Sequence, residues 1–509
     1  ASNNTAVGFK ALEANTTGTR NTAIGATAGD AMTTVSDNTY VGHGAGTANT
    51  SGDHNTGVGQ ASMDELTTGA NNTAIGSNSL SGVVTGDSNT AVGKSALNAN
   101  TSGADNTAVG ALALDANTTA DGNTAVGSSA LGANTTGADN VAMGEAALLS
   151  NTTANANTAV GTSALRANTT GHNNTSIGVS SMAANTTGVS NVAVGSNALD
   201  ANTTASNNTA VGKDALTANT TGTNNTAVGH LSLTTNTTTN NNTAVGVSAL
   251  QANVAGTENQ AFGTFALTSN TTGGDNTSVG YNSLGAATTG DNNVALGLRA
   301  GETLTTGTHN VLIGKNAGSY DGADITTGTQ NVLVGNFNKV SAADSANQIV
   351  MGYYVTSAGN SNFTFGNGTT DSNISFGETS IGAPSDVRLK EDIQDEEVGL
   401  DFINDLRPVT FQWKKEKDVP SDMNAYKADS ETRVMNGKYN HGFIAQEVKE
   451  VIDNHNLKDG FEMWQEDEAD GRQRLGEGAL MSVMVKAVQE LSAQVEELKT
   501  QPKCKCNEE

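Results

Sequence analysis

Acidic side chains are the most numerous groups in this sequence that can take part in catalysis. In the first part of the chain, the carboxylates fall at varied positions of a repeated pattern and do not recur as a pair; examples are Asp30, Asp53, Asp64, Glu65 and Asp115. A glycoside hydrolase needs two carboxyl groups held roughly 5 to 10 Å apart. The spacing within one chain does not favour such a site, although one assembled between chains stays open. We therefore do not favour a shaft that cleaves polysaccharides.

Histidine and cysteine give weaker signals, for metal binding. His43 and His230 each follow a repeated glycine directly, so association of identical chains would bring copies of each histidine around one axis. A solvent-facing turn is the interpretation that we favour. Cys504 and Cys506 are the only cysteines, and a C-x-C pair alone is a weak metal signal. Interchain disulfides and free thiols are plainer interpretations, and we expect neither a metal nor a cofactor.

The carboxylates and histidines named above belong to a repeated segment. The segment "NNTAVGKDALTANTTGT", residues 207–223, returns every 17 residues, and the glycine of its "AVG" core recurs without a slip from Gly8 to Gly314. Fixed-period similarity is typical of a solenoid, whose units stack to bury an apolar face. Seventeen residues suit a coil of two short strands and two turns, so we expect strands at "NTAVG" and "ALxANTTG" over residues 1–317. At a strand spacing of about 4.8 Å, the coils would form a rod on the order of 90 Å long.

Substitutions within "NTAVG" indicate which side of the strand is buried. The residue before the alanine becomes valine at Val141, and the residue after it is always large and apolar, as at Ile24 and Leu296. Because alternate residues share one face of a strand, we assign these two positions to the interior and the alanine to the outside. The alanine becomes Leu312 and Leu333 late in the array, so the outer face must also avoid water. Association of identical chains is the simplest cover for it.

Charge divides the chain near residue 385. Residues 1–385 carry 8 basic and 23 acidic residues, whereas the much shorter segment 386–509 carries 17 and 28. All prolines lie at or beyond Pro384, which favours continuous strand pairing before that point.

The net charge of −26 disfavours nucleic acid as a partner, and no apolar run has the roughly 20 residues of a membrane helix. Because the chain opens inside a repeat, we expect a fragment or processed product whose anchoring part lies upstream.

The repeat "NNTAVGxxALxANTTG" resembles the head repeats of trimeric autotransporter adhesins and of related phage tail fibres. The resemblance implies chains wound as a homotrimer. The expected fold is therefore mainly β: a homotrimeric left-handed parallel β-roll or β-solenoid shaft, followed by a small α+β domain.

After Gly314 the register of the repeat weakens and aromatic residues enter. We expect an irregular β tip or cap over residues 318–385, because the end of a repeat array must present a different surface. Closing the end of the core is the role that we favour for the aromatic residues, and contact with a receptor glycan is the alternative. They are Tyr320, Phe337, Tyr353, Tyr354, Phe363, Phe365 and Phe376.

Beyond Ile381 the motifs "SDVRLKEDI", "LRPVTFQWK" and "GFIAQEV" follow one another. They strongly resemble the intramolecular chaperone domain found at the C-terminus of endosialidases and of many phage tail spikes, fibres and neck appendages. The resemblance implies a chaperone domain over residues 386–480 that assembles three chains and then cleaves itself off. It implies Ser385 as the nucleophile before the scissile bond, Asp386 as the new N-terminus and Lys390 as the base partner.

A lysine can act as a base only if burial or nearby positive charge lowers its pKa, and Arg388 is the nearest charge to Lys390 in sequence. A serine attacking its own carbonyl would close a strained four-membered ring. Activation of a water, or attack from a neighbouring chain, therefore stays open. We interpret His441 and Glu447, in the third motif, as structural.

The last helix, expected over residues 481–500, has an apolar seam with alternating spacings of three and four. Such a heptad seam predicts a trimeric coiled coil, and packing into the domain's own core is the alternative. Residues 501–509 form a tail. The seam residues are Met481, Met484, Val488, Leu491, Val495 and Leu498.

The leading hypothesis is a homotrimeric phage tail fibre or appendage that binds a host surface receptor, a glycan or an outer-surface protein. Its place would be the virion, and its only expected enzymatic activity is autoproteolysis by a serine and lysine pair. A bacterial surface adhesin or extracellular filament with the same chaperone is the alternative, and a polysaccharide-degrading tail spike is the third hypothesis. An upstream virion-attachment domain would select the first hypothesis, and an upstream secretion signal the second.

Overall fold

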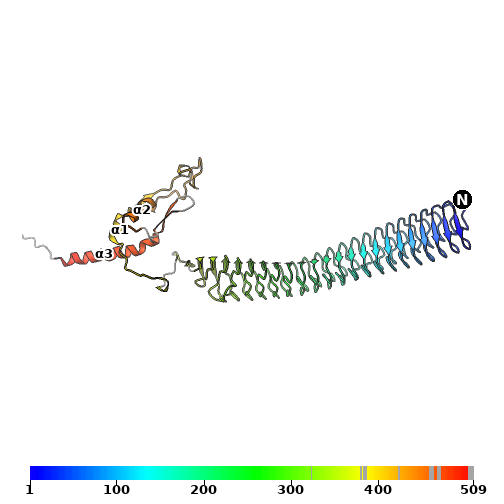
Figure 1. Cartoon of the computed structure of the whole chain (residues 1–509), viewed down its shortest axis with the longest axis horizontal. Coiled ribbons are helices and arrows are strands. Elements are labelled where there is room, and N and C mark those ends of the chain that lie inside the picture. Colours follow the sequence, from blue (N-terminus) through cyan, green and yellow to red (C-terminus); the bar gives the residue numbers. More distant parts are fainter. Residues whose placement is uncertain are drawn as a thin grey trace, which may run out of the picture. The chain divides into compact units, whose positions relative to one another are not determined.

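The structure is a computed structural model that describes all residues except 323, 369, 379–380, 382–386, 422, 424, 458–462, 467–471 and 502–509. The side chains of Leu389 and Glu477 are also outside the description. The chain divides into two compact units, Ala1–Pro384 and Ser385–Glu509 (Figure 1).

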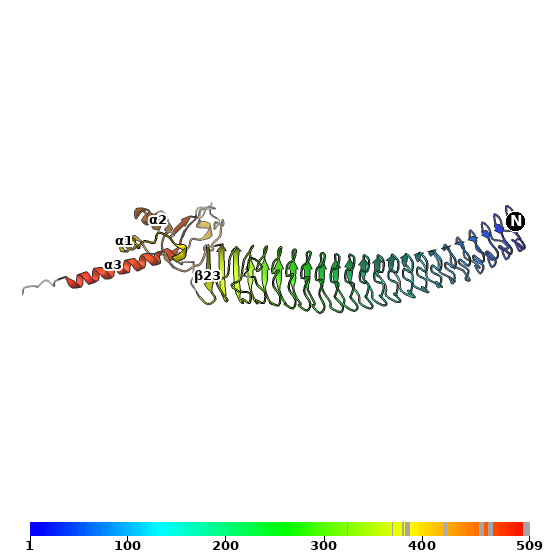
Figure 2. The same ribbon diagram turned by 60° about the horizontal axis from the view of Figure 1, so that its bottom comes forward.

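The first unit is a solenoid whose coils stack in parallel; Figure 2 shows the strands following one another along it. Each strand residue stands opposite its equivalent in the next coil, as Thr209 does to Thr226 and Ala210 to Ala227. Equivalent strands lie 17 residues apart up to β19 and 21 apart between β19 and β20. The predicted parallel β-solenoid is confirmed. Its three-residue strands are β1 (Thr5–Val7), β2 (Thr22–Ile24), β3 (Thr39–Val41), β4 (Thr56–Val58), β5 (Thr73–Ile75), β6 (Thr90–Val92), β7 (Thr107–Val109), β8 (Thr124–Val126), β9 (Val141–Met143), β10 (Thr158–Val160), β11 (Thr175–Ile177), β12 (Val192–Val194), β13 (Thr209–Val211), β14 (Thr226–Val228), β15 (Thr243–Val245), β16 (Gln260–Phe262), β17 (Thr277–Val279), β18 (Val294–Leu296), β19 (Val311–Ile313) and β20 (Val332–Val334).

The two faces of these strands are the reverse of our assignment. The middle residue is fully buried, as Ala91 and Ala210 are, whereas the residues on either side of it are partly exposed. Large side chains at the third strand position reach exposed fractions of 43% at Ile75, 45% at Met143 and 46% at Leu296. The assignment from residue size was wrong because a 17-residue coil has a narrow interior, which alanines and leucines fill at close packing. The Thr and Val face is therefore the one that a second surface would cover.

Turns occupy the place of the second strand that we expected in each coil. In the coil that begins at Gly161, Ser163 and Leu165 have φ of 57° and 51°, in the left-handed region, which interrupts an extended strand. The Leu165 amide still donates to the Ser181 carbonyl of the next coil, at 3.0 Å. The coils therefore stay hydrogen-bonded on this side without strand geometry, and Leu165 is fully buried.

A ladder of asparagines lies inside the coils, one in each coil from Asn4 to Asn331. Asn191 is fully buried; its Nδ2 donates to the Ala205 carbonyl at 2.8 Å, and its Oδ1 accepts the backbone N–H of Asn208 at 2.9 Å. Each side chain thus satisfies backbone groups that would be costly to bury unpaired. Because successive coils offer the same partners, a shift by one coil would preserve these contacts.

Near its two ends, the core has large residues where the other coils have small ones, and each is compensated by a small residue beside it. Leu312 stands where most strands have alanine, and Gly301 stands where most turns have leucine; a Cβ at Gly301 would lie 2.6 Å from a Leu312 methyl carbon. Tyr40 likewise replaces a strand alanine, and a Cβ at Gly46 or Gly57 would lie 2.5 or 2.9 Å from its ring. These exchanges distinguish the terminal coils from the uniform middle.

The array ends with three longer strands, β21 (Gln348–Tyr353), β22 (Asn362–Asn367) and β23 (Thr370–Ser375). β20, β21 and β22 pair in parallel, and β23 turns back antiparallel to β22. In β22 the buried residues are Asn362 and Thr364, and the two phenylalanines alternate with them on the partly exposed face. The expectation that the aromatic residues close the core is therefore wrong, because the alternation of the strand turns them outward.

The second unit is a small α+β fold with helices α1 (Leu400–Asp405), α2 (Ala445–Asn454) and α3 (Leu480–Thr500). Its strands form two antiparallel pairs, β24 (Val409–Phe411) with β25 (Asn440–Gly442) and β26 (Trp464–Glu466) with β27 (Gln473–Leu475). Short 3₁₀ turns cover Val387–Leu389, Glu416–Asp418 and Glu477–Ala479. The buried core consists of Phe402, Leu406, Val448, Ile452, Met463, Leu480 and Val483.

Candidate functional site

The predicted cleavage junction is at the start of the second unit. Ser385 and Asp386 lie outside the described residues. Lys390 is exposed and follows the 3₁₀ turn Val387–Leu389, where its backbone N–H donates to the Val387 carbonyl at 3.2 Å. The catalytic roles of Ser385, Asp386 and Lys390 therefore remain predictions.

The two later motifs of the second unit meet in one substructure. β24, from "LRPVTF", pairs with β25, from "HGFIAQEV", so that Thr410 stands opposite His441. The Arg407 guanidinium donates two hydrogen bonds to the Glu447 carboxylate, one from Nε to Oε2 at 3.0 Å and one from Nη2 to Oε1. The hydrogen bond from Arg407 holds the pKa of Glu447 below its ordinary value. Glu447 thus ties the first turn of α2 to Arg407, two residues before β24, a structural role.

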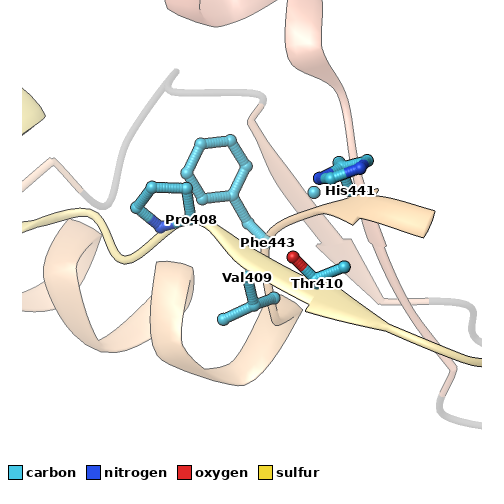
Figure 3. Close-up of a pocket in the computed structure, with 6 residues that line it drawn as sticks. Pro408, Val409, Thr410, His441 and Phe443 are labelled. Atoms are coloured by element: carbon cyan, nitrogen blue, oxygen red, sulfur yellow. The ribbon is translucent and has the colours of Figure 1, made fainter. Parts of the chain in front are cut away.

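A pocket of about 350 Å³ lies beside this strand pair. Figure 3 shows the rings of Pro408 and Phe443 close together and the His441 ring apart from them. Apart from His441, the lining contains no titratable side chain, so the pocket offers an apolar contact surface with few groups for turnover. The lining residues are Pro408, Val409, Thr410, His441, Gly442 and Phe443.

Helix α3 has two apolar faces. Leu480, Val483 and Ala487 are buried, and the helix packs against α1. Every seam residue, by contrast, is between 42% and 67% exposed. The alternative that the seam packs into the unit's own core is therefore wrong, and the seam lies open to a partner.

Exposed ion pairs connect the segments between β24 and β25. The Glu431 carboxylate binds the ammonium groups of both Lys415 and Lys417. These hydrogen bonds lower the pKa of Glu431 to about 2. Glu416 binds Lys427 at 2.8 Å, which also lowers the pKa of Glu416.

The carboxylates of Asp64 and Asp115 are not placed as the pair that a glycosidase requires. Asp53 is structural, because its Oδ1 accepts the backbone N–H of Ser36 from the preceding coil at 2.7 Å. Partial burial raises the pKa of Asp64 and that of Asp115. These two stand at equivalent positions three coils apart, hence about 14 Å, which is beyond the roughly 5 to 10 Å of a carboxylate pair.

Within the described ranges, no group of three or more His, Cys, Asp or Glu side chains is arranged to hold a metal ion. Cys504 and Cys506 lie outside those ranges. None of the described helices is both long enough and apolar enough to cross a membrane.

Residues 385–457 match the family model described as chaperone of endosialidase. The C-terminal unit carries this chaperone domain. The match begins at Ser385, directly after the solenoid unit ends at Pro384, and it includes β24, β25 and α2. No curated protein and no solved structure matches the chain. A chaperone of endosialidase domain behind a long parallel solenoid fits a phage tail fibre-like protein.

Sequence reasoning missed two features of this domain. It did not single out Arg407, although the opposite charges of Arg407 and Glu447 in two characteristic motifs were a usable signal. It also missed the second apolar face of α3, with Leu480 and Val483, because the regular seam accounted for the helix by itself.

Proposed function

We propose that the chain forms the shaft of a homotrimeric phage tail fibre or appendage and that its chaperone domain cleaves it between Ser385 and Asp386. One observation carries the proposal: the solenoid unit ends at Pro384, and the chaperone family begins at the next residue. Cleavage at this junction would release the folding domain and leave every coil intact.

Two exposed apolar surfaces support assembly of identical chains. One follows the outward strand face, where residues such as Ile75 and Met143 are exposed. The other is the seam of α3. A soluble monomer rarely exposes apolar stripes of this length, so both surfaces call for a partner. The seam spacing and the chaperone family favour three copies.

The uniform solenoid explains why a chaperone is needed. Two chains displaced by one coil would still offer each other equivalent residues, because the outward strand face presents nearly the same residues in every coil. Association and loop-closure entropy also oppose the first contacts between distant parts of a chain. A trimerising domain at the chain end fixes the register and holds the chains together while the first coils form.

Cleavage would add water across the peptide bond, giving a Ser385 carboxylate and an Asp386 amino group. Lys390 would accept the proton, either from an attacking water or from the Ser385 hydroxyl of a neighbouring chain. In the second route the Asp386 amine would leave with that proton, and water would then hydrolyse the ester to the Ser385 carboxylate. Both routes avoid the four-membered ring of direct self-attack. Both also require the pKa of the lysine to fall in the assembled trimer, where burial can provide the shift.

The test is the intact mass of the denatured purified protein. We expect the wild-type protein to give a fragment that begins at Asp386, and Ser385→Ala and Lys390→Ala to give only the full-length mass. Lys438→Ala removes another exposed lysine of the same unit and should leave cleavage unchanged.

A single full-length mass for the wild-type protein would contradict autoproteolysis. Cleavage of Lys390→Ala at the wild-type rate would remove Lys390 from the mechanism. In the first case the domain would stay attached as a permanent cap on the shaft.

A further inference from the structure

An aromatic patch lies on the outside of the solenoid near its C-terminal end, made of Tyr320, Phe337, Tyr353 and Tyr354. Ring centroids lie 4.8 Å apart for Tyr320 and Phe337, 5.2 Å for Tyr320 and Tyr354, and 5.4 Å for Tyr353 and Tyr354. The Tyr354 hydroxyl donates to the Tyr320 hydroxyl at 2.6 Å. The rings therefore support one another as a single surface.

One ring of the patch comes from the lengthened spacing between β19 and β20. Four extra residues interrupt the 17-residue period there, and Tyr320 belongs to that segment. Phe337 and Tyr354 each follow a core glycine by two positions, and both have positive φ, of 60° and 64°. The equivalent residue of other coils, such as Phe265 with φ of 61°, has the same geometry, so the two rings occupy a regular turn position of the repeat.

The aromatic patch is not part of the solenoid core. The interior at this level is filled by Leu333, Val350 and Val355, all fully buried. Tyr353 is 51% exposed and Tyr354 is 37% exposed. Exposed aromatic rings that carry hydroxyl groups suit a ligand with both apolar and hydrogen-bonding surfaces.

Two lysines give the patch its charge. Lys315 Nζ lies 5.3 Å from the ring centroid of Phe337, and Lys339 Nζ lies 5.4 Å from that of Tyr320. Lys339 is also 3.9 Å from Asp321, whereas Lys315 makes no ion pair with any residue that the structure describes. Residues 1–385 contain only 8 lysines and arginines against 23 acidic residues, so two cations on one aromatic surface stand out from an acidic shaft.

We propose that the aromatic patch binds an acidic saccharide. The C–H face of a sugar ring would stack on Tyr353 and Tyr354, tyrosine hydroxyls would hydrogen-bond its hydroxyl groups, and Lys315 would meet a carboxylate or sulfate. Lys315 and Tyr353 follow core glycines two coils apart, so they stand about 10 Å from each other along the shaft. That separation matches two linked sugar rings.

The chemistry of the patch favours a sugar over a second copy of the chain. Elsewhere the outward strand face presents mostly Thr, Val and Ile, which carry no charge. A contact between identical chains here would desolvate tyrosine hydroxyls and bring copies of Lys315 together, and like charges in a desolvated contact are unfavourable.

An acidic glycan ligand would give the proposed tail fibre a means of attachment, and in this sense the inference rests on the proposed function. The full chain would be applied to an array of printed sialylated, uronic acid, sulfated and neutral glycans. We expect retention on acidic glycans, and a loss of about tenfold or more in affinity for Tyr353→Ala. Lys315→Gln should remove the preference for acidic over neutral glycans.

The chain offers a matched control in Phe265 and Tyr281, an exposed pair whose centroids lie 5.9 Å apart. Tyr281→Ala should bind as the wild type does. Retention of no glycan, or equal binding by wild type, Tyr353→Ala and Lys315→Gln, would overturn the inference. A change of oligomeric mass in Tyr353→Ala by light scattering would also overturn it, because the patch would then be a contact between copies. Intact mass reports autoproteolysis separately, so failure of the proposed maturation is distinguishable from failure of glycan binding.

Discussion

Most contacts in the solenoid have an equivalent one coil away, whereas each contact in the chaperone unit occurs once. Asn191 and its equivalents hold coil to coil through the same pair of hydrogen bonds. Arg407 with Glu447, and Glu431 with its two lysines, have no second copy among the residues that the structure describes. The solenoid contacts therefore specify that one coil stacks on another, but they do not specify which two coils stack.

The difference teaches how the two regions depend on each other. A region whose contacts are unique finds one register by itself, and a region of repeated contacts needs a starting point. The exceptions within the solenoid support this view: its unusual core residues, such as Tyr40 and Leu312, lie near its two ends, where a register must begin or stop. The predictions below test this division of labour, from the largest expected effect to the smallest.

The largest effect should come from the seam of α3. Leu491→Asp places one carboxylate from each chain inside the predicted coiled coil, where like charges repel and burial is costly. We expect loss of the trimer and, with it, loss of most folded shaft, measured by light scattering and by the β signal in circular dichroism. Ala493→Asp adds the same charge at an exposed position outside the seam and should assemble normally. Full-length rods from Leu491→Asp would show that the shaft finds its register without the helix.

A glycine in the middle of the solenoid should be far less replaceable than one in the chaperone unit. Gly178 has φ of 137°, and a Cβ there would lie 2.5 Å from the Gly195 carbonyl oxygen. We expect Gly178→Ala to lower the free energy of unfolding by about 3 kcal/mol or more, because both backbone strain and contact with the next coil oppose it.

Gly437→Ala is the matched control, since a Cβ at Gly437 would meet no atom within 4 Å. Its effect should stay within about 0.5 kcal/mol. Chemical denaturation gives the size of both effects, and hydrogen exchange of the coils beside Gly178 locates the damage. Equal effects of the two substitutions would contradict the close stacking of the coils.

Substitutions at Gly301 and Leu312 should compensate each other. Leu312→Ala alone should cost about 3 kcal/mol by leaving a cavity, and Gly301→Leu alone about 2 kcal/mol by overfilling the same space. The double variant has the leucine and the alanine that most coils have at these two positions, and it should recover to within about 1 kcal/mol of the wild type. Leucine suits the backbone there, because Leu284 has φ of 49° at the equivalent position one coil earlier. Additive losses in thermal denaturation would show that the two residues do not share one space.

The repeat period predicted the parallel stacking because a fixed spacing leaves few other ways to bury the repeated residues. It could not predict the faces of the strand, since that depends on the width of the coil interior and not on the size of the side chains. The positive φ of Leu165 was also hidden, because leucine gives no signal for a left-handed conformation. In the chaperone unit, Arg407 and Glu447 are 40 residues apart, and only the fold shows that they meet.

The smallest of the predicted effects is the change in stability of the two regions on acidification. Glu431 has a pKa of about 2, below its ordinary value of 4.5. The stability that its ion pairs contribute is complete above about pH 4.5 and is lost as the pH falls towards 2. In the solenoid, burial raises the pKa of Asp64 and that of Asp115, so protonation relieves a cost as the pH falls through the raised pKa. Asp37, whose pKa is lowered by its hydrogen bond to Arg20, acts in the opposite direction, which leaves a small net change.

We therefore expect acidification from about pH 6 to about pH 3 to lower the melting temperature of the chaperone unit by a few degrees and to change that of the solenoid less. Tryptophan fluorescence separates the two transitions, because Trp413 and Trp464 are the only tryptophans and both belong to the chaperone unit. Glu431→Gln should reduce the acid sensitivity of that unit, since the Glu431 carboxylate has its pKa lowered to about 2. If the solenoid melted first on acidification, ion pairs would not be what makes the chaperone unit sensitive, and the contrast between repeated amide contacts and unique charged contacts would fail.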